Sequence, residues 1–485
     1  MSQKPSLANA TVIGTFWVYL SSYSGKFLFF ISTIILARLL SKDDFGVAGY
    51  ALLLISFIQF PDLGLATALI YFKKDSKLTN TAFWLSLLTG FSLGLFTFLI
   101  APLAGMFFSD DRAVGVTRVL ALYFPLASLG SIQEALFIKD LAFKNKILPQ
   151  VAEASSRGIS AIVLAWFGFG AWSIVISQII GTAIQTSIWW LMSSWRPTLE
   201  FSTTLAKPLL SYGLRIIGGN ILATTLLNTD YLCIGYFLNA AALGVYTLAF
   251  RIPELVIMQF CTILGNVLFP IYAKIQDDPE AMNKALLITV RYVTVITFPI
   301  GVGLMLVAEP LVLTTFGQKW VEAIPVMQII PFYATLRSIT YHYGSVYKSQ
   351  GKPELVIHLN LFLVIFTVPV LWYATSHYGT IVAVAQAQAV LAFLGVIVQS
   401  VVVSNLLNIQ YYRIAESLRP GIIGSIVMIF PVLASLQFLQ GFMPIIQLTV
   451  SVLVGAVVYA LALWWLQREI VNHGIKTFQN VRAKR

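Results

Sequence analysis

The sequence predicts an all-α polytopic membrane protein, and two observations support this fold class. Of the 485 residues, 58% are hydrophobic and only 11% are charged, and the mean hydropathy is +0.83. Soluble globular proteins typically contain about 25% charged residues. Apolar segments of ~20 residues or more also recur from one end of the chain to the other, and each is long enough to cross a ~30 Å hydrocarbon core as a helix.

We predict fourteen membrane helices in chain order. Their approximate ranges are 12–38, 44–72, 79–107, 113–138, 147–167, 171–193, 208–237, 242–273, 284–307, 322–347, 355–375, 380–403, 417–436 and 445–466. The first is too long for a cleavable signal peptide and contains Lys26, so we expect it to remain as an anchor. The connections are short, which leaves no room for a catalytic domain outside the membrane.

The distribution of Lys and Arg predicts the orientation. With the N-terminus in the cytoplasm, the inside segments hold 20 of the 31 basic residues and the outside loops hold only 4, namely Arg38, Lys42, Arg112 and Lys319. Cytoplasmic loops carry the excess of Lys and Arg in membrane proteins. We therefore expect an even number of helices and both termini in the cytoplasm. The net charge of +11 reflects these loops and does not indicate a nucleic-acid partner.

A weak internal repeat suggests two similar halves. Phe45-Gly46-Val47 begins the second helix after a polar turn, and Leu243-Gly244-Val245 begins the eighth. Because both copies have the same orientation by the charge count, the repeat would be parallel. We expect a first lobe of six helices over 1–195, a second lobe of six over 196–405, and two further helices with a cytoplasmic tail over 406–485.

The stretch from Ile34 to Leu65 carries the resemblance to a known family. Its first helix ends in LARLL, a turn reads S-x-x-D-F-G from Ser41 to Gly46, and the next helix closes on D-L-G-L from Asp62. This pattern resembles the start of the Wzx-type polysaccharide and lipopolysaccharide O-antigen flippases of the MOP superfamily, in the colanic-acid exporter branch.

The resemblance implies a fold, a substrate and a place in the cell. The fold would be two six-helix lobes around a central cavity. The substrate would be an oligosaccharide on undecaprenyl diphosphate, moved across the bacterial inner membrane by alternating access for lipopolysaccharide, capsule or exopolysaccharide synthesis. Membrane lipid, a polysaccharide polymerase and a chain-length regulator would be the partners.

Seven basic residues remain inside the predicted helices: Lys26, Arg118, Arg157, Arg215, Arg251, Arg291 and Arg337. Arg118 and Arg291 lie within two turns of helix ends, where long side chains reach the interface. Lys26 lies near the middle of the first helix on a polar face. We select Lys26, Arg251, Arg215 and Arg337 as candidate substrate-binding residues. The alternative for Arg251 is an ion pair with Glu254, and for Arg157 one with Glu153.

Five acidic residues also lie inside the helices: Asp62, Glu134, Glu153, Asp230 and Glu254. Glu134 is expected to pair with Lys139 near a helix end. Asp62, which follows Pro61, and Asp230 are candidates for gating or ion coupling, and the alternative for both is a structural salt bridge. The excess of basic groups would favour an anionic substrate such as a diphosphate, which suits Lys as a point charge and Arg as a two-pronged donor.

Other functions are less consistent with the residues. A multidrug (MATE-type) cation antiporter would present buried acids to its substrate, whereas a lipid II flippase would also carry an anionic lipid. A membrane enzyme acting on lipid-linked glycans usually has a large outside loop, and the four histidines, His342, His358, His377 and His473, are scattered. No G-x-x-x-x-G-K-[ST] motif for ATP occurs. We expect no catalytic residues, no cofactor and no metal.

Overall fold

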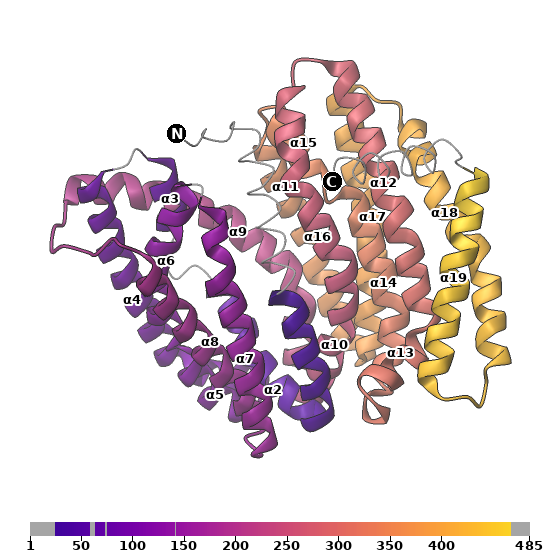
Figure 1. Ribbon diagram of the computed structural model, residues 1–485, viewed down its shortest axis with the longest axis horizontal. Coiled ribbons are helices and arrows are strands. Elements are labelled where there is room, and N and C mark those ends of the chain that lie inside the picture. The colour runs from indigo at the N-terminus through magenta and orange to yellow at the C-terminus, as the bar shows by residue number, and fades with distance from the viewer. Residues whose placement is uncertain (1–24, 59–63, 73–74, 141, 467–485) are drawn as a thin grey trace, which may run out of the picture. The chain divides into compact units, whose positions relative to one another are not determined.

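In a computed structural model, most of the residues that the structure describes, which are 25–58, 64–72, 75–140 and 142–466, are helical. The chain forms two compact units, Met1–Thr247 and Leu248–Arg485. Figure 1 shows each unit as a bundle of long helices. The lobe boundaries given by the sequence repeat are not tested by this division and stay a prediction.

The first unit begins with a helix over residues 25–39. The helices that follow are α2 (Lys42–Ile58), α3 (Leu65–Tyr71), α4 (Ser76–Phe108), α5 (Arg112–Leu120), α6 (Tyr123–Lys139), the 3-10 turn η1 (Phe143–Lys146), α7 (Ile147–Trp166), α8 (Ala171–Met192), α9 (Thr203–Phe237) and the first part of α10 (Ala240–Pro253). One apolar core joins α3, α4, α6 and the start of α9, with Leu65, Leu69 and Leu209 fully buried.

The second unit continues from α10. It contains the π-helical turn η2 (Glu254–Met258), α11 (Gln259–Lys274), α12 (Pro279–Leu306), α13 (Ala308–Thr315), the 3-10 turn η3 (Gln318–Trp320), α14 (Ala323–Thr340), α15 (Tyr343–Ser349), α16 (Glu354–Tyr378), α17 (Ile381–Leu407), α18 (Tyr411–Phe438) and α19 (Pro444–Leu466). Figure 1 shows α18 and α19 side by side at the edge of this bundle, and they pack directly against each other.

All fourteen predicted ranges contain a helix in the part of the chain that the structure describes. Four ranges are broken within the described residues by a short turn or a change of helix type, at Gly64, at residues 121–122, at Glu254–Met258 and at residues 341–342. The short helix α13 was not predicted. Nine segments of the described chain are long and apolar enough to cross a membrane. The polytopic helical fold is therefore confirmed, whereas the number fourteen stays a prediction.

Helix starts follow the local sequence. Asp75 and Asp278 accept hydrogen bonds from backbone N–H groups in the first turns of α4 and α12, and Pro279 occupies the first position of α12, where its missing N–H costs nothing. Helix ends also follow the sequence. α16 ends at Gly379, which adopts φ +61°, a backbone conformation that glycine tolerates and most other residues do not.

Contacts between connections in the first unit agree with helices that alternate in direction. At one end, Asp43 and Asp110 both bind Arg112, which brings together the connections before α2 and after α4. At the other end, the Asn80 amide donates to Thr198 Oγ1 at 2.5 Å, joining the start of α4 to the segment after α8. The predicted up-and-down order fits these pairs. These contacts do not indicate which end faces the cytoplasm.

Candidate functional site

The S-x-x-D-F-G motif is a helix start with three separate contacts. Ser41 Oγ donates to Asp44 Oδ2 at 2.7 Å and accepts from the Asp44 N–H at 3.1 Å, which is a capping box at the start of α2. Asp44 Oδ1 also accepts the first N–H of α8, from Ala171, at 3.0 Å. Phe45 is buried, and Gly46 lies against the backbone of Ala240. The motif therefore joins α2, α8 and α10 within the first unit.

Gly46 and Gly244, which the sequence repeat aligns, lie together in the structure. An added Cβ on Gly46 would be 2.6 Å from Ala240 Cα, and one on Gly244 would be 3.0 Å from Gly46 N and 3.1 Å from Phe45 Cβ. These are closer than normal carbon–carbon contacts of about 3.5–4.0 Å. The starts of α2 and α10 can therefore touch only because both positions lack a side chain.

Lys26 is an exposed residue near the start of the described part of the first helix. Its neighbour Gly25 faces α7, because a Cβ there would lie 3.5 Å from Ala154 Cβ. The predicted polar face of this helix continues to Thr33, and the part of the predicted helix before residue 25 lies outside the described residues. Thr33 is buried and donates to the Phe29 carbonyl.

An ion pair lies on the face of α7 that packs against this helix. Glu153 and Arg157 pair at 3.8 Å, and the Arg157 guanidinium lies 4.4 Å from the centre of the Phe29 ring. Because Gly25 packs on Ala154 and Phe29 on Arg157, Lys26 lies within one turn of this pair along the interface. The structure thus places one predicted binding residue, which is itself exposed, near a partly exposed ion pair in the first unit.

Asp230 is fully buried, with 1% of its surface exposed. Its Oδ2 accepts a hydrogen bond from the Tyr246 hydroxyl of α10 at 2.9 Å, and its Oδ1 accepts from the Tyr231 N–H at 3.0 Å. A buried carboxylate needs such donors, since an unsatisfied charge in a low-dielectric interior is costly. Sequence reasoning did not identify Tyr246, because a contact between separate helices leaves no periodic signal.

For two predicted residues the structure describes no side chain. Asp62 lies outside the described residues. Arg215 belongs to α9, but its side chain is not described. Their assigned roles stay predictions.

Arg251 and Arg337 lie near the same ring contact in the second unit. Arg251 pairs with Glu254 at 3.8 Å, immediately before the π-helical turn η2. Arg337 donates to the Tyr333 hydroxyl at 2.9 Å, and the Tyr333 ring lies 5.7 Å from the ring of Phe250, the residue before Arg251. This ring contact joins α10 to α14 at the residue before Arg251 and one turn from Arg337. π-helical turns are frequent at functional sites.

Arg118, Glu134 and Lys139 have local partners. The Arg118 guanidinium lies 5.3 Å from the centre of the Phe98 ring, and its side chain is exposed. Glu134 pairs with Lys146 at 2.8 Å, not with Lys139 as the sequence suggested. The Lys139 ammonium instead donates to the carbonyls of Leu69 and Phe72 at 2.7 Å each, where it satisfies the open end of α3.

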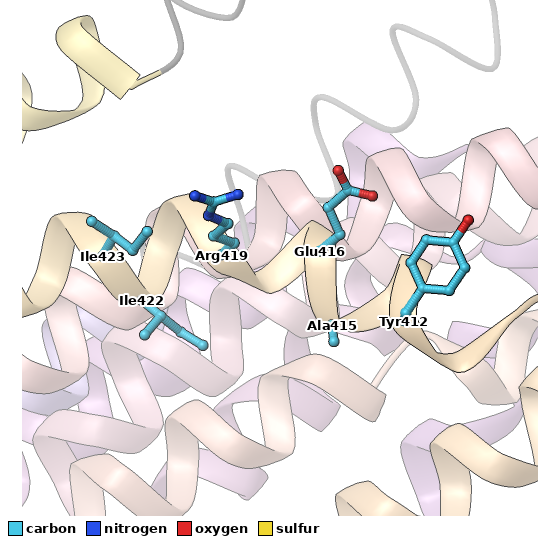
Figure 2. A pocket seen from close by; sticks show the side chains of 6 residues that line it. All are labelled: Tyr412, Ala415, Glu416, Arg419, Ile422 and Ile423. Atoms are coloured by element: carbon cyan, nitrogen blue, oxygen red, sulfur yellow. The ribbon is translucent and has the colours of Figure 1, made fainter.

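Two hollows lie where α18 begins. One, of about 690 Å³, is lined by α12 and by Arg413. The other, of about 510 Å³, follows α18 itself. Figure 2 shows Tyr412, Glu416 and Arg419 on one side of this helix, with Ala415 and Ile422 turned the other way.

The comparisons with known proteins decide the family. The model of a family described as polysaccharide biosynthesis protein matches residues 35–325. The chain belongs to this family. It is 28% identical to the lipopolysaccharide biosynthesis protein WzxC of Escherichia coli, over 78% of this chain and 77% of that one. It is 23% identical to the teichuronic acid biosynthesis protein TuaB of Bacillus subtilis, over 80% and 81%.

Solved transporters share the fold. A lipid II flippase MurJ in an inward closed conformation superposes with a TM-score of 0.77 at 13% identity, covering 94% of this chain and 99% of that one. An inward-facing MATE transporter of the MOP superfamily gives 0.66 at 15% identity, covering 79% and 95%. The resemblance to polysaccharide flippases of the MOP superfamily is thus confirmed, and this member of the family has a transporter fold. At these identities, the structural likenesses describe the fold alone.

Proposed function

We propose that this protein moves an oligosaccharide linked to undecaprenyl diphosphate from the inner to the outer leaflet of the bacterial inner membrane. The relatives are named for lipopolysaccharide, teichuronic acid and succinoglycan biosynthesis, and the last is a succinoglycan transport protein. Both termini are cytoplasmic in this proposal, and a polysaccharide polymerase and a chain-length regulator use the product. Alternating access supplies the mechanism.

The observation that supports an anionic substrate is the excess of basic groups inside the helices. In the second unit, Arg251 pairs with Glu254, and Arg337 lies one turn from Tyr333, which contacts the neighbour of Arg251. In the first unit, Lys26 lies beside the Glu153–Arg157 pair. Each region therefore has one more cation than acid. Guanidinium and ammonium groups at these positions would offer several charge-assisted hydrogen bonds to a diphosphate.

The acidic residues support this substrate more than an organic cation. Glu153 and Glu254 each face an arginine, and Asp230 faces the Tyr246 hydroxyl. A cation carrier would need carboxylates that are open to the substrate. In the proposal, Lys26, Arg251, Arg215 and Arg337 bind the diphosphate, and Asp62 and Asp230 serve gating or ion coupling.

The test is transport in proteoliposomes. The vesicles carry a fluorescent undecaprenyl-diphosphate oligosaccharide on one face, and an impermeant quencher or lectin reports its arrival on the other. We expect movement that requires both the protein and the diphosphate. Lys26→Gln and Arg251→Gln are expected to abolish it and leave the protein inserted and folded.

Arg118→Gln is the matched control, because it removes a positive charge from a helix at an exposed position against Phe98. It is expected to transport at the wild-type rate. Full activity in Lys26→Gln combined with Arg251→Gln would contradict the cationic binding site. Export of a cationic dye with no movement of any lipid-linked sugar would instead indicate a multidrug carrier.

A further inference from the structure

The hollow between α12 and the start of α18 has a mixed set of charges. Three basic side chains line it, from Lys284, Arg291 and Arg413, together with two acidic ones, from Asp278 and Glu280. Lys284 and Arg291 form no ion pair with any carboxylate in the described chain. A purely anionic ligand would be repelled by the two acidic side chains, and a purely cationic ligand would be repelled by the three basic ones. A ligand that carries both a negative and a positive group can pair with both sets of side chains.

Two residues of the lining, Arg291 and Asn283, each have a buried polar atom without a hydrogen-bond partner among the described residues. Arg291 Nε is buried and donates to no acceptor among the described residues, and Asn283 Oδ1 is buried and accepts from no donor among them. Buried polar groups are normally hydrogen-bonded, so each such atom calls for a partner. Arg291 needs an acceptor such as a phosphate oxygen, whereas Asn283 needs a donor such as an ammonium group.

The position of the hollow indicates a membrane surface. It lies where two candidate membrane spans begin, α12 at Pro279 and α18 at Tyr411. Tyr411 and Tyr412 are 55% and 59% exposed there. Tyrosines gather where the apolar core of a bilayer meets its headgroups.

The apolar part of the lining continues along α12. Leu287 and Ile288 lie between Lys284 and Arg291 on one face of the helix, and Ile288 is 42% exposed. A lipid with its headgroup among the charges would have its acyl chains beside these two residues.

We propose that this hollow binds the headgroup of an aminophospholipid, with its phosphate on Lys284, Arg291 and Arg413 and its ammonium on Asn283, Asp278 and Glu280. Phosphatidylethanolamine has the required chemistry. Phosphatidylglycerol lacks the ammonium group, and phosphatidylcholine has a cation without N–H donors. The site is separate from the transport path proposed above and does not depend on the identity of the transported sugar.

Native mass spectrometry of the purified protein with each of these three lipids tests the proposal. We expect one phosphatidylethanolamine to be retained at concentrations where the other two are not. Arg291→Gln is expected to weaken retention about tenfold, as for the loss of one hydrogen bond between charged groups. Asn283→Leu should remove the preference over phosphatidylglycerol. Lys284 is exposed, so Lys284→Gln gives a second charge variant that leaves the packing intact.

Lys352→Gln is the matched control. This exposed cation lies at the same end of the second unit, where the neighbouring Gln350 donates to the Gln276 carbonyl, but it does not line the hollow. Equal retention of all three lipids, or unchanged binding in both Arg291→Gln and Lys284→Gln, would overturn the proposal. Displacement of the lipid by soluble O-phosphoethanolamine at equal concentration would overturn the lipid assignment, because Leu287 and Ile288 should favour a ligand with acyl chains.

Discussion

Replacing Gly46 by alanine should loosen the contact between the starts of α2 and α10. The new Cβ would lie 2.6 Å from Ala240 Cα and closer still to the Ala240 carbonyl. Normal carbon–carbon contact begins near ~3.5 Å, and the Ala240 carbonyl carbon would lie even nearer to the new Cβ than Ala240 Cα does, so the two backbones must separate by more than about 1 Å. Overpacking of this kind costs about 1–3 kcal/mol. Backbone atoms receive the clash, and they cannot rotate away as a flexible side chain would.

Hydrogen exchange at the start of α2 measures this loss directly. A cost of about 1–3 kcal/mol raises the open population, and hence the exchange rate, roughly five- to 150-fold. We expect this acceleration in a peptide that covers residues 41–50, both for Gly46→Ala and for Gly244→Ala.

Gly303→Ala is the control for a general effect of adding a methyl group to a helix. A Cβ at Gly303 would lie 3.6 Å from Met428 Cε, which is an ordinary contact with a flexible side chain. Exchange at the start of α2 should be unchanged in this variant. Wild-type exchange in Gly46→Ala, or equal acceleration in Gly303→Ala, would refute the reasoning.

Three further predictions concern hydrogen bonds in the first unit. Asp44→Ala removes caps from two helices, α2 and α8, and should lower the free energy of unfolding by about 1–3 kcal/mol. Thermal unfolding in detergent measures this loss, and an unchanged melting temperature would contradict the prediction. Tyr246→Phe takes one donor from buried Asp230 and should cost about 1–3 kcal/mol in the same assay, with Tyr236→Phe, a partly exposed tyrosine, as the control. The hydrogen bond from Arg112 lowers the pKa of Asp110 in the folded protein, so ionised Asp110 stabilises the fold. This stabilisation is complete above the ordinary pKa of the unfolded chain, and it is lost as the pH falls through the lowered pKa of the folded protein. Arg112→Gln should therefore flatten the dependence of the melting temperature on pH between about 3 and 5, and an equally steep dependence would count against this pair.

Hydropathy was sufficient to place the helices because continuous apolar runs leave few other structures in a membrane. The same signal cannot locate a turn inside a run. The break at residues 121–122 lies within continuous apolar sequence, and the π-helical turn follows Pro253, whose missing N–H removes a helix hydrogen bond. α13 was missed because eight residues are too few for a span.

The candidate site was only partly accessible to sequence reasoning. Partners on the same helix were predictable, and the Glu153–Arg157 and Arg251–Glu254 pairs follow directly from spacings of four and three residues. The Tyr333–Arg337 hydrogen bond has the same spacing and could have been found in this way. Partners on other helices depend on packing, which explains why Tyr246 and Lys146 were not assigned to Asp230 and Glu134.

The π-helical turn at Glu254–Met258 has a consequence for the register of the long segment from α10 to α11. Such a turn holds one residue more than the α-helical turn it replaces. Because successive residues of an α-helix are about 100° apart, one extra residue in a continuous α-helix would rotate α11 by that angle relative to α10, and the wider π-helical turn absorbs the extra residue instead. Cys261 of α11 is fully buried in this register. Relatives that lack the turn would then have to be aligned with a one-residue gap here, and a gap placed elsewhere would misassign every facing residue of α11.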